Sequence, residues 1–405
     1  MLTIANPRHA QALRGKTVLV RVAYDVPLQV HGNTWRVTDT RRIAATLPTL
    51  RRLIALRCKL VLLTWVGRPG GKRQQQYSVV PIAKTLSALL KKKVPVVDHC
   101  VGPVRATALR ALQPGDVVLL ENVRFYKAEE QNQAGFAQQL VADCDAVVFD
   151  AFAQAHRDCP SITGILAARP HYAGLLMEQE LRQFAKLLGK KQASPYILVL
   201  GGAKTADKIP VIKQLLPHVD GILLGGGPAN VFLKAMGIPV GASYTAKTVT
   251  ESRHVVRIAQ ALYQQAPHKF IVPLDAYAAP NIAEHAKPLR VDISQHQKIP
   301  NDHLFLDIGP KTIKFYTELI AGAKMIFWNG PMGVFEYRAF ARGTRAITRA
   351  IAANAGTTIV GGGDTESVIA RYRIGDCFTH VSTGGGASLA LIAGQDLPGI
   401  SALQK

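Results

Sequence analysis

The sequence predicts an α/β protein with two domains, each built on a parallel β-sheet that is covered by helices. Short apolar runs alternate with longer, helix-like stretches along the whole chain. Because the runs are apolar throughout and not at every second residue, we expect strands that are buried on both faces, as in parallel sheets. The length of 405 residues is too great for one ordinary hydrophobic core and suits two domains.

Five apolar runs predict the strands of the first domain: TVLVRVAY at 17–24, KLVLLTW at 59–65, VPVVDH at 94–99, DVVLLEN at 116–122 and AVVFDAF at 146–152. The first run contains Arg21 and is followed closely by Asp25. In a strand that reached Asp25, the two side chains would lie on one face, because side chains alternate. The pair is then either a structural tie or the floor of a site, and the run leaves both open.

Six runs predict a second sheet: YILVLGG at 196–202, GILLGGG at 221–227, FIVPLDA at 270–276, KMIFWNG at 324–330, TTIVGGGD at 357–364 and THVSTGGG at 379–386. Between the two sets, ARPHYAG at 168–174 is expected to interrupt regular structure. The segment that follows has apolar residues at helical spacing, so we expect a helix that joins the domains within 170–195.

Composition argues against several functional classes. The five cysteines are scattered without CxxC spacing, which indicates neither a zinc site nor a disulfide framework. No apolar run approaches the roughly 20 residues of a membrane helix, and the first residues do not resemble a signal peptide, so we expect a cytoplasmic protein. The net charge of +22 is spread along the chain. We therefore expect a diffuse basic surface and no nucleic-acid partner, with incidental polyanion binding as the alternative.

Glycine follows four strand ends in the second half, in VLGGAKTADK, LLGGGPAN, IVGGGDTE and STGGGAS. Ligands of parallel sheets bind at the carboxyl ends of the strands. Glycine lets backbone N–H groups approach an anion closely, and a helix that begins there favours negative charge. One such cluster often marks only a turn, but four in one domain predict a phosphate site.

Charged residues beside these glycines suit a phosphate–metal site. Asp364 is a candidate ligand for nucleotide-bound Mg²⁺, with a helix N-cap as the alternative or additional role. Lys204 and Lys208 are four residues apart and share a helix face if the helix begins near Ala203. A solvated helix face is the alternative for both lysines. The Walker motif GxxxxGK[ST] does not occur in the sequence.

The segment WNGPMGVFE, residues 328–336, predicts a rigid turn after a strand. Asn329 offers an amide, and Glu336 offers a carboxylate suited to ribose hydroxyls. Pro331 and Val334 would form an apolar wall. For any one of these residues a purely structural turn stays open.

Several arginines of the first half lie in or beside turn-like segments: Arg42, Arg68, Arg124 and Arg157. A single arginine is usually a surface residue. If several converge at one sheet edge, they form a pocket for a phosphate or a carboxylate through bidentate hydrogen bonds. His156 is a further candidate donor, with a local backbone contact as the alternative.

Together these segments resemble the phosphoglycerate kinase family. The matching pieces run in family order from about residue 16 to 399: RRIAATLPTL, GRP, LLENVRF, DAFAQAHR, AGLLMEQEL, GGAKTADKI, GGGPANVFLKAMG, LDIGP, WNGPMGVFE, GGGDT and STGGGASL. The resemblance implies two Rossmann-like domains that face a cleft and are joined by a helix. Residues 1–172 would bind 3-phosphoglycerate or 1,3-bisphosphoglycerate, 173–190 would form the helix, 191–392 would bind ADP or ATP, and 393–405 would pack back on the first domain.

The resemblance also implies the activity. It is direct in-line phosphoryl transfer between 1,3-bisphosphoglycerate and ADP, reversible, within glycolysis and gluconeogenesis, by a monomer that closes its domains around the substrates. Mg²⁺ would enter as Mg-ADP or Mg-ATP.

By motif match, the resemblance assigns a role to each site residue. The catalytic set would be Arg42, Lys204, Gly363 and Gly386. The acid substrate would be bound by Asp25, Arg42, Trp65, Arg68, Arg124 and Arg157. The nucleotide would be bound by Gly202, Ala203, Lys204, Lys208, Gly227, Asn329, Pro331, Val334, Glu336, Gly362, Gly363, Asp364 and Thr365. The metal ligand would be Asp364.

Three departures from the family pattern lie in the acid-binding half. Ala23 stands where the family has a carboxylate and Asp25 where it has asparagine, Trp65 replaces a histidine, and Cys159 replaces another. We expect Asp25 to supply the missing carboxylate. Three hypotheses follow, in order of preference: an active phosphoglycerate kinase, a kinase of the same class for a different acid, and a nucleotide-binding protein without catalysis.

Overall fold

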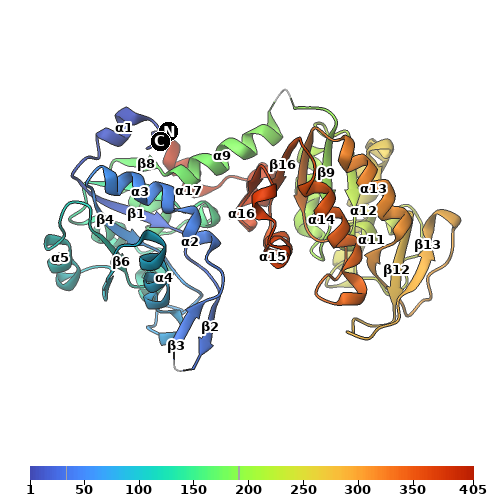
Figure 1. The fold of residues 1–405 in the computed structure, drawn as a ribbon, viewed down its shortest axis with the longest axis horizontal. Coiled ribbons are helices and arrows are strands. Elements are labelled where there is room, and N and C mark those ends of the chain that lie inside the picture. Colours follow the sequence, from blue (N-terminus) through green and yellow to red (C-terminus); the bar gives the residue numbers. More distant parts are fainter. Residues whose placement is uncertain (33, 190–191) are drawn as a thin grey trace. The chain divides into compact units, whose positions relative to one another are not determined.

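The computed structural model describes residues 1–32, 34–189 and 192–405. The chain divides into two compact units, unit 1 with Met1–Arg182 and Asp396–Lys405, and unit 2 with Gln183–Gln395 (Figure 1). Each unit contains a six-stranded sheet, and all pairings within these two sheets are parallel. The predicted α/β class is confirmed. Within the described residues, no helix is both long and apolar enough to span a membrane.

The sheet of unit 1 has the strand order β5-β6-β4-β1-β7-β8. Its strands are β1 (Thr17–Val22), β4 (Lys59–Leu63), β5 (Val96–Val97), β6 (Val117–Leu120), β7 (Ala146–Asp150) and β8 (His171–Ala173). Each of the five predicted runs contains one of them. Val20 at the centre of β1 is paired with Leu62 of β4 and Val148 of β7, and all three are fully buried. A short hairpin, β2 (Leu28–His31) and β3 (Thr34–Val37), stands apart from this sheet.

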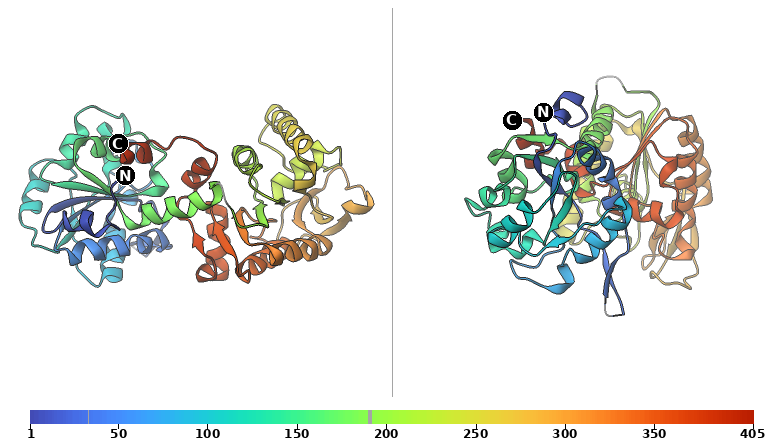
Figure 2. Two further views of the ribbon diagram at one scale, coloured as in Figure 1. Left: turned by 90° about the horizontal axis from the view of Figure 1, so that it is seen from above. Right: turned by 60° about the vertical axis from the view of Figure 1, so that its left-hand side comes forward.

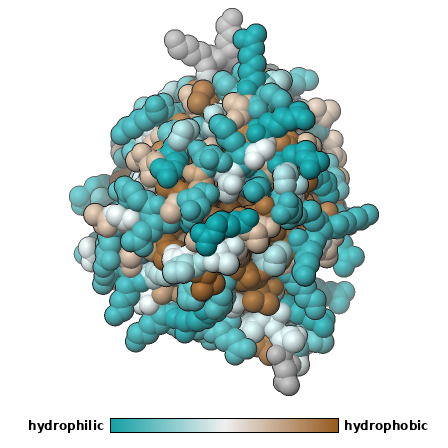
Figure 3. All heavy atoms as spheres, turned by 90° about the vertical axis from the view of Figure 1, so that its left-hand side faces the viewer, coloured by the Kyte–Doolittle hydropathy of each residue, from teal (hydrophilic) through white to brown (hydrophobic). Residues whose placement is uncertain are grey.

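Helices cover the sheet of unit 1 (Figure 2). They are α1 (Pro7–Gln11), α2 (Arg41–Ala45), α3 (Leu47–Ala55), α4 (Val80–Leu90), α5 (Pro103–Arg110), α6 (Lys127–Glu130), α7 (Phe136–Val141), α8 (Ile165–Ala168) and α17 (Pro398–Gln404). One core cluster joins Val18 and Val20 of β1 to Leu50 of α3 and Ile82 of α4. Hydrophilic side chains predominate on the face seen in Figure 3, with apolar ones in small groups between them.

The expected break at 168–174 contains the edge strand β8, which pairs with β7; its three residues are too few to make an apolar run. The C-terminal helix α17 belongs to unit 1, where the Gly399 N–H donates to the Ala155 carbonyl at 2.9 Å. A Cβ at Gly399 would lie 3.1 Å from that oxygen, so glycine permits this approach.

Helix α9 (Leu175–Leu188) occupies the region where a joining helix was expected, and the boundary between the units falls within it. It is shorter than the expected range of 173–190, and residues 190 and 191 lie outside the described residues.

The parallel sheet of unit 2 has the order β11-β10-β9-β15-β16-β17. Its strands are β9 (Tyr196–Leu200), β10 (Gly221–Leu224), β11 (Phe270–Ile271), β15 (Met325–Asn329), β16 (Thr357–Val360) and β17 (His380–Val381). Its helices are α10 (Ile209–Leu215), α11 (Gly226–Ala235), α12 (Val249–Gln265), α13 (Pro310–Gly322), α14 (Arg342–Ala352), α15 (Gly363–Tyr372) and α16 (Gly386–Ile392).

Unit 2 contains a second sheet that the apolar runs did not predict. It is antiparallel and consists of β12 (Asp275–Ala279), β13 (Leu289–Asp292) and β14 (Leu304–Ile308). The run at 270–276 was expected to be one strand, but Ile271 ends β11 and Asp275 begins β12, in a different sheet. Pro273 lies between them, and proline cannot donate a ladder hydrogen bond in the middle of a sheet.

Asp150, at the carboxyl end of β7, makes the stability of unit 1 dependent on pH. The side chain is fully buried and accepts the Met177 N–H at 3.0 Å. Burial raises the pKa of Asp150 to about 6. A carboxyl with a raised pKa in the folded state favours folding while protonated, and this contribution is lost as the pH rises from about 4 through about 6.

We expect Asp150→Asn to become more stable relative to the wild type as the pH rises over this range. The amide mimics the protonated acid, and a shift of roughly two pKa units corresponds to about 3 kcal/mol. Urea titrations of both proteins at about pH 4 and about pH 8 measure the change. Asp376→Asn, at an exposed position, serves as control. A difference between Asp150→Asn and the wild type that stays constant with pH would contradict the assignment.

Candidate active site

All six residues predicted to bind the acid substrate line one pocket of unit 1, which encloses about 200 Å³. They are Asp25, Arg42, Trp65, Arg68, Arg124 and Arg157, and Gly67, Ala153, Gln154 and His156 complete the lining. All but Arg42 follow the carboxyl ends of β1, β4, β6 or β7, which lie side by side in this parallel sheet. Four arginines against one aspartate make the pocket suitable for an anion with more than one charged group.

Trp65 lies between two guanidinium groups. The Cζ atoms of Arg21 and Arg124 lie 4.4 Å and 4.0 Å from the centroid of its ring. The ring is only 3% exposed, so it does not fill the pocket, although it forms part of its wall. Such cation–π contacts are strongest where water is excluded, and here they fix the position of Arg124.

Of the two alternatives for Arg21 and Asp25, the structural tie is wrong. Strand β1 ends at Val22, so strand alternation does not carry the two side chains to one face. Arg21 is fully buried, and its Nε donates to the Ser161 carbonyl at 3.0 Å. The Ser161 hydroxyl in turn donates to Glu129 at 2.6 Å. Burial lowers the pKa of Arg21 to about 10. Arg21 is therefore a structural residue beneath Trp65.

Asp25 connects two arginines of the pocket. Its carboxylate accepts the Gly67 N–H at 3.0 Å, and its backbone carbonyl accepts Arg42 Nη1 at 2.8 Å. The Gly67 carbonyl accepts Arg124 Nη1 at 2.8 Å. Asp25 thus lies at the floor of the pocket and holds the loop on which Arg124 rests.

Arg68 and Arg157 are exposed in this pocket. Within the described part of the chain, neither guanidinium makes a hydrogen bond or ion pair, so both are free to bind an anion. Burial and the charge of Arg157 lower the pKa of His156, which favours its neutral form. A neutral imidazole can still donate one hydrogen bond to the same anion.

A second pocket, in unit 2, encloses about 200 Å³ at the glycine-rich strand ends. Its lining includes the predicted residues Lys204, Lys208, Asn329, Gly362, Gly363, Asp364, Thr365 and Gly386. Helix α15 begins here at Gly363, and its N-cap is Gly362 with φ +97°. Asp364 is therefore inside the first turn and not the N-cap, and its exposed side chain is available to a ligand.

Lys204 and Lys208 do not share a helix face, because the helix expected to begin near Ala203 begins later. A 3₁₀ turn spans Ala206–Lys208, and α10 begins only at Ile209. The two lysines nevertheless meet at the pocket, where Lys208 Nζ donates to the Lys204 carbonyl at 3.2 Å. Lys204 is exposed, whereas Lys208 is 4% exposed and burial lowers its pKa.

A third, largely apolar pocket of about 570 Å³ continues from the second, because Lys204 and Asp364 line both. The predicted residues here are Gly202, Ala203, Gly227, Pro331, Val334 and Glu336. A Cβ at Gly227 would lie 2.7 Å from the Ala203 carbonyl oxygen, so only glycine allows this close approach. An apolar pocket of this size, next to a glycine-rich pocket suited to phosphates, is suitable for the planar base of a nucleotide.

Several residues of this apolar pocket carried no signal in the sequence: Asn230 and the apolar or aromatic residues Tyr244, Ile282, Leu304, Phe305, Leu306 and Phe335. Tyr244 and Ile282 are 41% and 46% exposed. Apolar residues of this kind look like core residues in a sequence, so no signal distinguished them. An exposed apolar side chain in a pocket is informative only once its burial is known.

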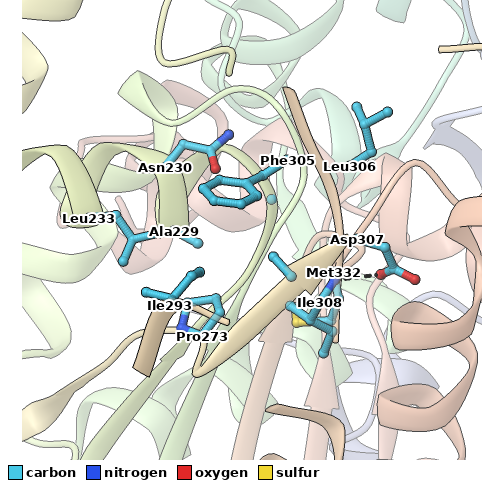
Figure 4. A pocket seen from close by; sticks show the side chains of 12 residues that line it. Ala229, Asn230, Leu233, Pro273, Ile293, Phe305, Leu306, Asp307, Ile308 and Met332 are labelled. Atoms are coloured by element: carbon cyan, nitrogen blue, oxygen red, sulfur yellow. Dashed lines mark hydrogen bonds between the residues drawn. The ribbon is translucent and has the colours of Figure 1, made fainter. Parts of the chain in front are cut away.

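A small cavity of about 20 Å³, lined in part by Ala229, Leu233 and Phe305, lies next to the apolar pocket (Figure 4). It has room for about one water molecule. Asp307 borders it, and its carboxylate accepts the Ile308 N–H at 3.0 Å and the Gly343 N–H at 2.7 Å. Burial raises the pKa of Asp307 to about 8. Asp307 therefore serves structure, since it binds the first turn of α14.

The family model, the similar sequences and the similar structures all belong to one protein family. A family model described as "Phosphoglycerate kinase" matches residues 9–395. The chain is similar to the protein named "Phosphoglycerate kinase" from Geobacter metallireducens, with 42% identity over 98% of this chain and 97% of that protein. It is also 44% identical to the protein of the same name from Dictyoglomus turgidum, over 97% of this chain and 96% of that protein.

Two solved structures resemble the whole chain. The phosphoglycerate kinase from Coxiella burnetii has a TM-score of 0.84 at 35% identity, covering 100% of this chain and 98% of that one. The phosphoglycerate kinase from Pyrococcus horikoshii has a TM-score of 0.85 at 32% identity with the same coverage.

Proposed function

Because this chain belongs to the phosphoglycerate kinase family, we propose that it transfers a phosphoryl group reversibly between 1,3-bisphosphoglycerate and ADP. The products are 3-phosphoglycerate and ATP. The observation that carries the proposal is the gathering of Arg42, Arg68, Arg124 and Arg157 in one pocket of unit 1.

In this proposal the pocket of unit 1 that is lined by Asp25 and four arginines holds the glycerate. Arg68, Arg124 and Arg157 bind its phosphate and carboxylate region, because guanidinium forks match both groups. Arg42 stabilises the transferring phosphoryl group. Asp25 and Trp65 act on the arginines, through the hydrogen bonds and ring contacts described above, and Asp25 is also placed to accept a hydrogen bond from the glycerate hydroxyl.

The two connected pockets of unit 2 hold the nucleotide. The apolar pocket takes the base, between Gly227 and the wall formed by Pro331 and Val334, and Glu336 takes the ribose hydroxyls. The phosphates lie against Gly362, Gly363 and Thr365. Lys208 and Asn329 border the phosphates, and Lys204 and Gly386 join Arg42 in stabilising the transferred group.

The residues fit a magnesium ion that arrives with the nucleotide. Asp364 offers one exposed carboxylate beside the lysines, and among the described residues no group of three or more His, Cys, Asp or Glu could hold a metal by itself. Mg²⁺ is commonly held by one or two carboxylates together with substrate phosphates. When bound, it neutralises charge on the phosphates.

Catalysis of this reaction requires the protein to align the substrates and to supply fixed positive charge. The acceptor is a carboxylate that is already ionised, so no general base is required. In phosphoryl transfer, aligned groups and fixed positive charge supply most of the rate enhancement. We further propose a cytoplasmic monomer that closes during turnover, which would exclude water from the transferred group.

A coupled assay with 3-phosphoglycerate and Mg-ATP tests the function, and the reverse reaction can be followed as ATP formation. We expect turnover in both directions. Formation of acyl phosphates from other carboxylic acids in preference to 3-phosphoglycerate would support a different acid substrate. Nucleotide binding without transfer to any acid would support a binding protein instead.

We expect Trp65→Ala to raise the KM for 3-phosphoglycerate about tenfold, with little change in the KM for ATP. It removes the ring between Arg21 and Arg124, and each buried cation–π contact is worth roughly 1–2 kcal/mol. Trp65→Phe should restore most of the affinity. Trp35→Ala, in the hairpin strand β3, is the matched control. A rise in both KM values together would show that Trp65 acts only on stability.

A further inference from the structure

A separate pocket in unit 2 is lined by four arginines that the proposed reaction does not use. It encloses about 720 Å³, and its charged lining is Glu284, Glu336, Arg338, Arg342, Arg345 and Arg371. The arginines come from a 3₁₀ turn at Arg338–Phe340, from the first turn of α14, and from α15. Residues up to 87 positions apart in the sequence therefore meet at one place.

The four guanidinium groups are not neutralised by ion pairs. All four arginines are exposed, and none makes an ion pair within 4.0 Å in the described part of the chain. By contrast, Arg73 is paired with Asp98 on the surface of unit 1. The two glutamates leave an excess of positive charge, and arginines without carboxylate partners favour an anionic ligand.

Local structure sets the spacing of two of these arginines and holds the side chain of a third. Arg342 and Arg345 are three residues apart on α14 and lie on one helix face. Arg371 donates to the Glu336 carbonyl at 3.4 Å, and its Cζ lies 5.8 Å from the centroid of the Phe335 ring. Arg349 is on the same helix and is also exposed, but it does not line the pocket.

This pocket is distinct from the nucleotide site, although the two are neighbours. Glu336 lines both, whereas none of the four arginines lines the apolar pocket or the glycine-rich pocket. An anion here would therefore be bound outside the site of phosphoryl transfer.

We propose that the arginine pocket binds an anion that carries two or more linked phosphoryl groups. One guanidinium group binds a phosphate through two parallel N–H···O bonds. Four guanidinium groups around this volume therefore suit a chain of phosphates better than a single phosphate. The chain is either inorganic polyphosphate or the phosphate chain of a second nucleotide, and the pocket recognises the chemistry that the two share.

Calorimetric titration with sodium tripolyphosphate tests the proposal. The full chain is first given excess 3-phosphoglycerate and one equivalent of Mg-ADP, in excess Mg²⁺ and at low ionic strength, so that the substrate sites are filled while the proposed site stays open. We expect additional binding of one tripolyphosphate. The double variant Arg342→Ala/Arg345→Ala should bind it at least about tenfold more weakly, since a hydrogen bond to a charged group is worth about that factor or more. The matched variant Arg349→Ala should bind it like the wild type.

The outcomes separate the alternatives. Tighter binding of a non-hydrolysable ATP analogue than of tripolyphosphate, lost in the double variant, assigns the pocket to a second nucleotide; equal or weaker binding of the analogue assigns it to inorganic polyphosphate. The proposal is overturned if the double variant retains binding, if Arg349→Ala loses it equally, or if inorganic phosphate binds as tightly. Tighter binding of a short RNA would also overturn it.

Kinase activity provides an independent readout. The double variant should turn over 3-phosphoglycerate and ATP like the wild type, because neither arginine belongs to the proposed reaction. A failure of the proposed kinase reaction would leave the tripolyphosphate result unaffected, so the two proposals can fail separately.

Discussion

Arg42→Ala is expected to lower kcat by about 10³-fold at saturating substrates, because it removes a fixed positive charge from the transferring phosphoryl group. Arg42 Nη1 is held by the Asp25 carbonyl at 2.8 Å, so its guanidinium is already placed in the pocket before substrate binds. Steady-state kinetics in both directions measure the effect. The KM values should change far less than kcat, since the charge acts mainly in the transition state.

The neighbouring residue provides the control. Arg41 precedes Arg42 in α2 but is paired with Asp39 at 2.5 Å, and it does not line the pocket. Arg41→Ala should stay within about twofold of the wild type, as expected for a surface ion pair. An equal loss in both variants would mean that the charge of the whole segment matters and not the position of Arg42. A loss confined to KM would make Arg42 a binding residue only.

Asp364→Asn is expected to weaken Mg-ADP binding about tenfold or more and to lower kcat by about 10²-fold or more, because the amide cannot replace the carboxylate as a magnesium ligand. Titration calorimetry with ADP, with and without Mg²⁺, separates the two contributions. The wild type should gain affinity from Mg²⁺, and the variant should lose most of that gain while it still binds free ADP.

Asp207 is the appropriate comparison, because it lines the same pocket and is also an exposed aspartate. Asp207→Asn should retain the magnesium dependence. The reverse pattern, with magnesium dependence lost in Asp207→Asn and kept in Asp364→Asn, would reassign the ligand.

Strand positions were readable from the sequence because both faces of each parallel strand are buried. The apolar run at 59–65 contains β4, of which only Lys59 is not fully buried. The same reasoning failed where a strand is too short or too mixed in composition to form an apolar run. Strand β8 is a three-residue edge strand. Strands β12 (DAYAA) and β13 (LRVD) include charged residues, although four of the five residues of β12 are buried.

Local motif chemistry also located much of the candidate site. Arg68 and Arg124 follow strand ends, and parallel strands bring their carboxyl ends to one edge of the sheet. The proposed tie between Arg21 and Asp25 failed for a related reason. It assumed a strand three residues longer than β1, and strand boundaries depend on pairing with neighbours that a single run does not contain.

The sequence by itself determined the α/β class, the order of the strands along the chain, and the kinds of residue that the site offers: arginines in the first half, and glycines, lysines and an aspartate in the second. Tertiary structure alone decided which of these residues meet. It placed Trp65 between Arg21 and Arg124, brought Tyr244 and Ile282 to one pocket, and gathered Arg338, Arg342, Arg345 and Arg371 around another. The physical reason is that backbone periodicity and residue type are local properties, whereas these contacts join segments that only packing brings together.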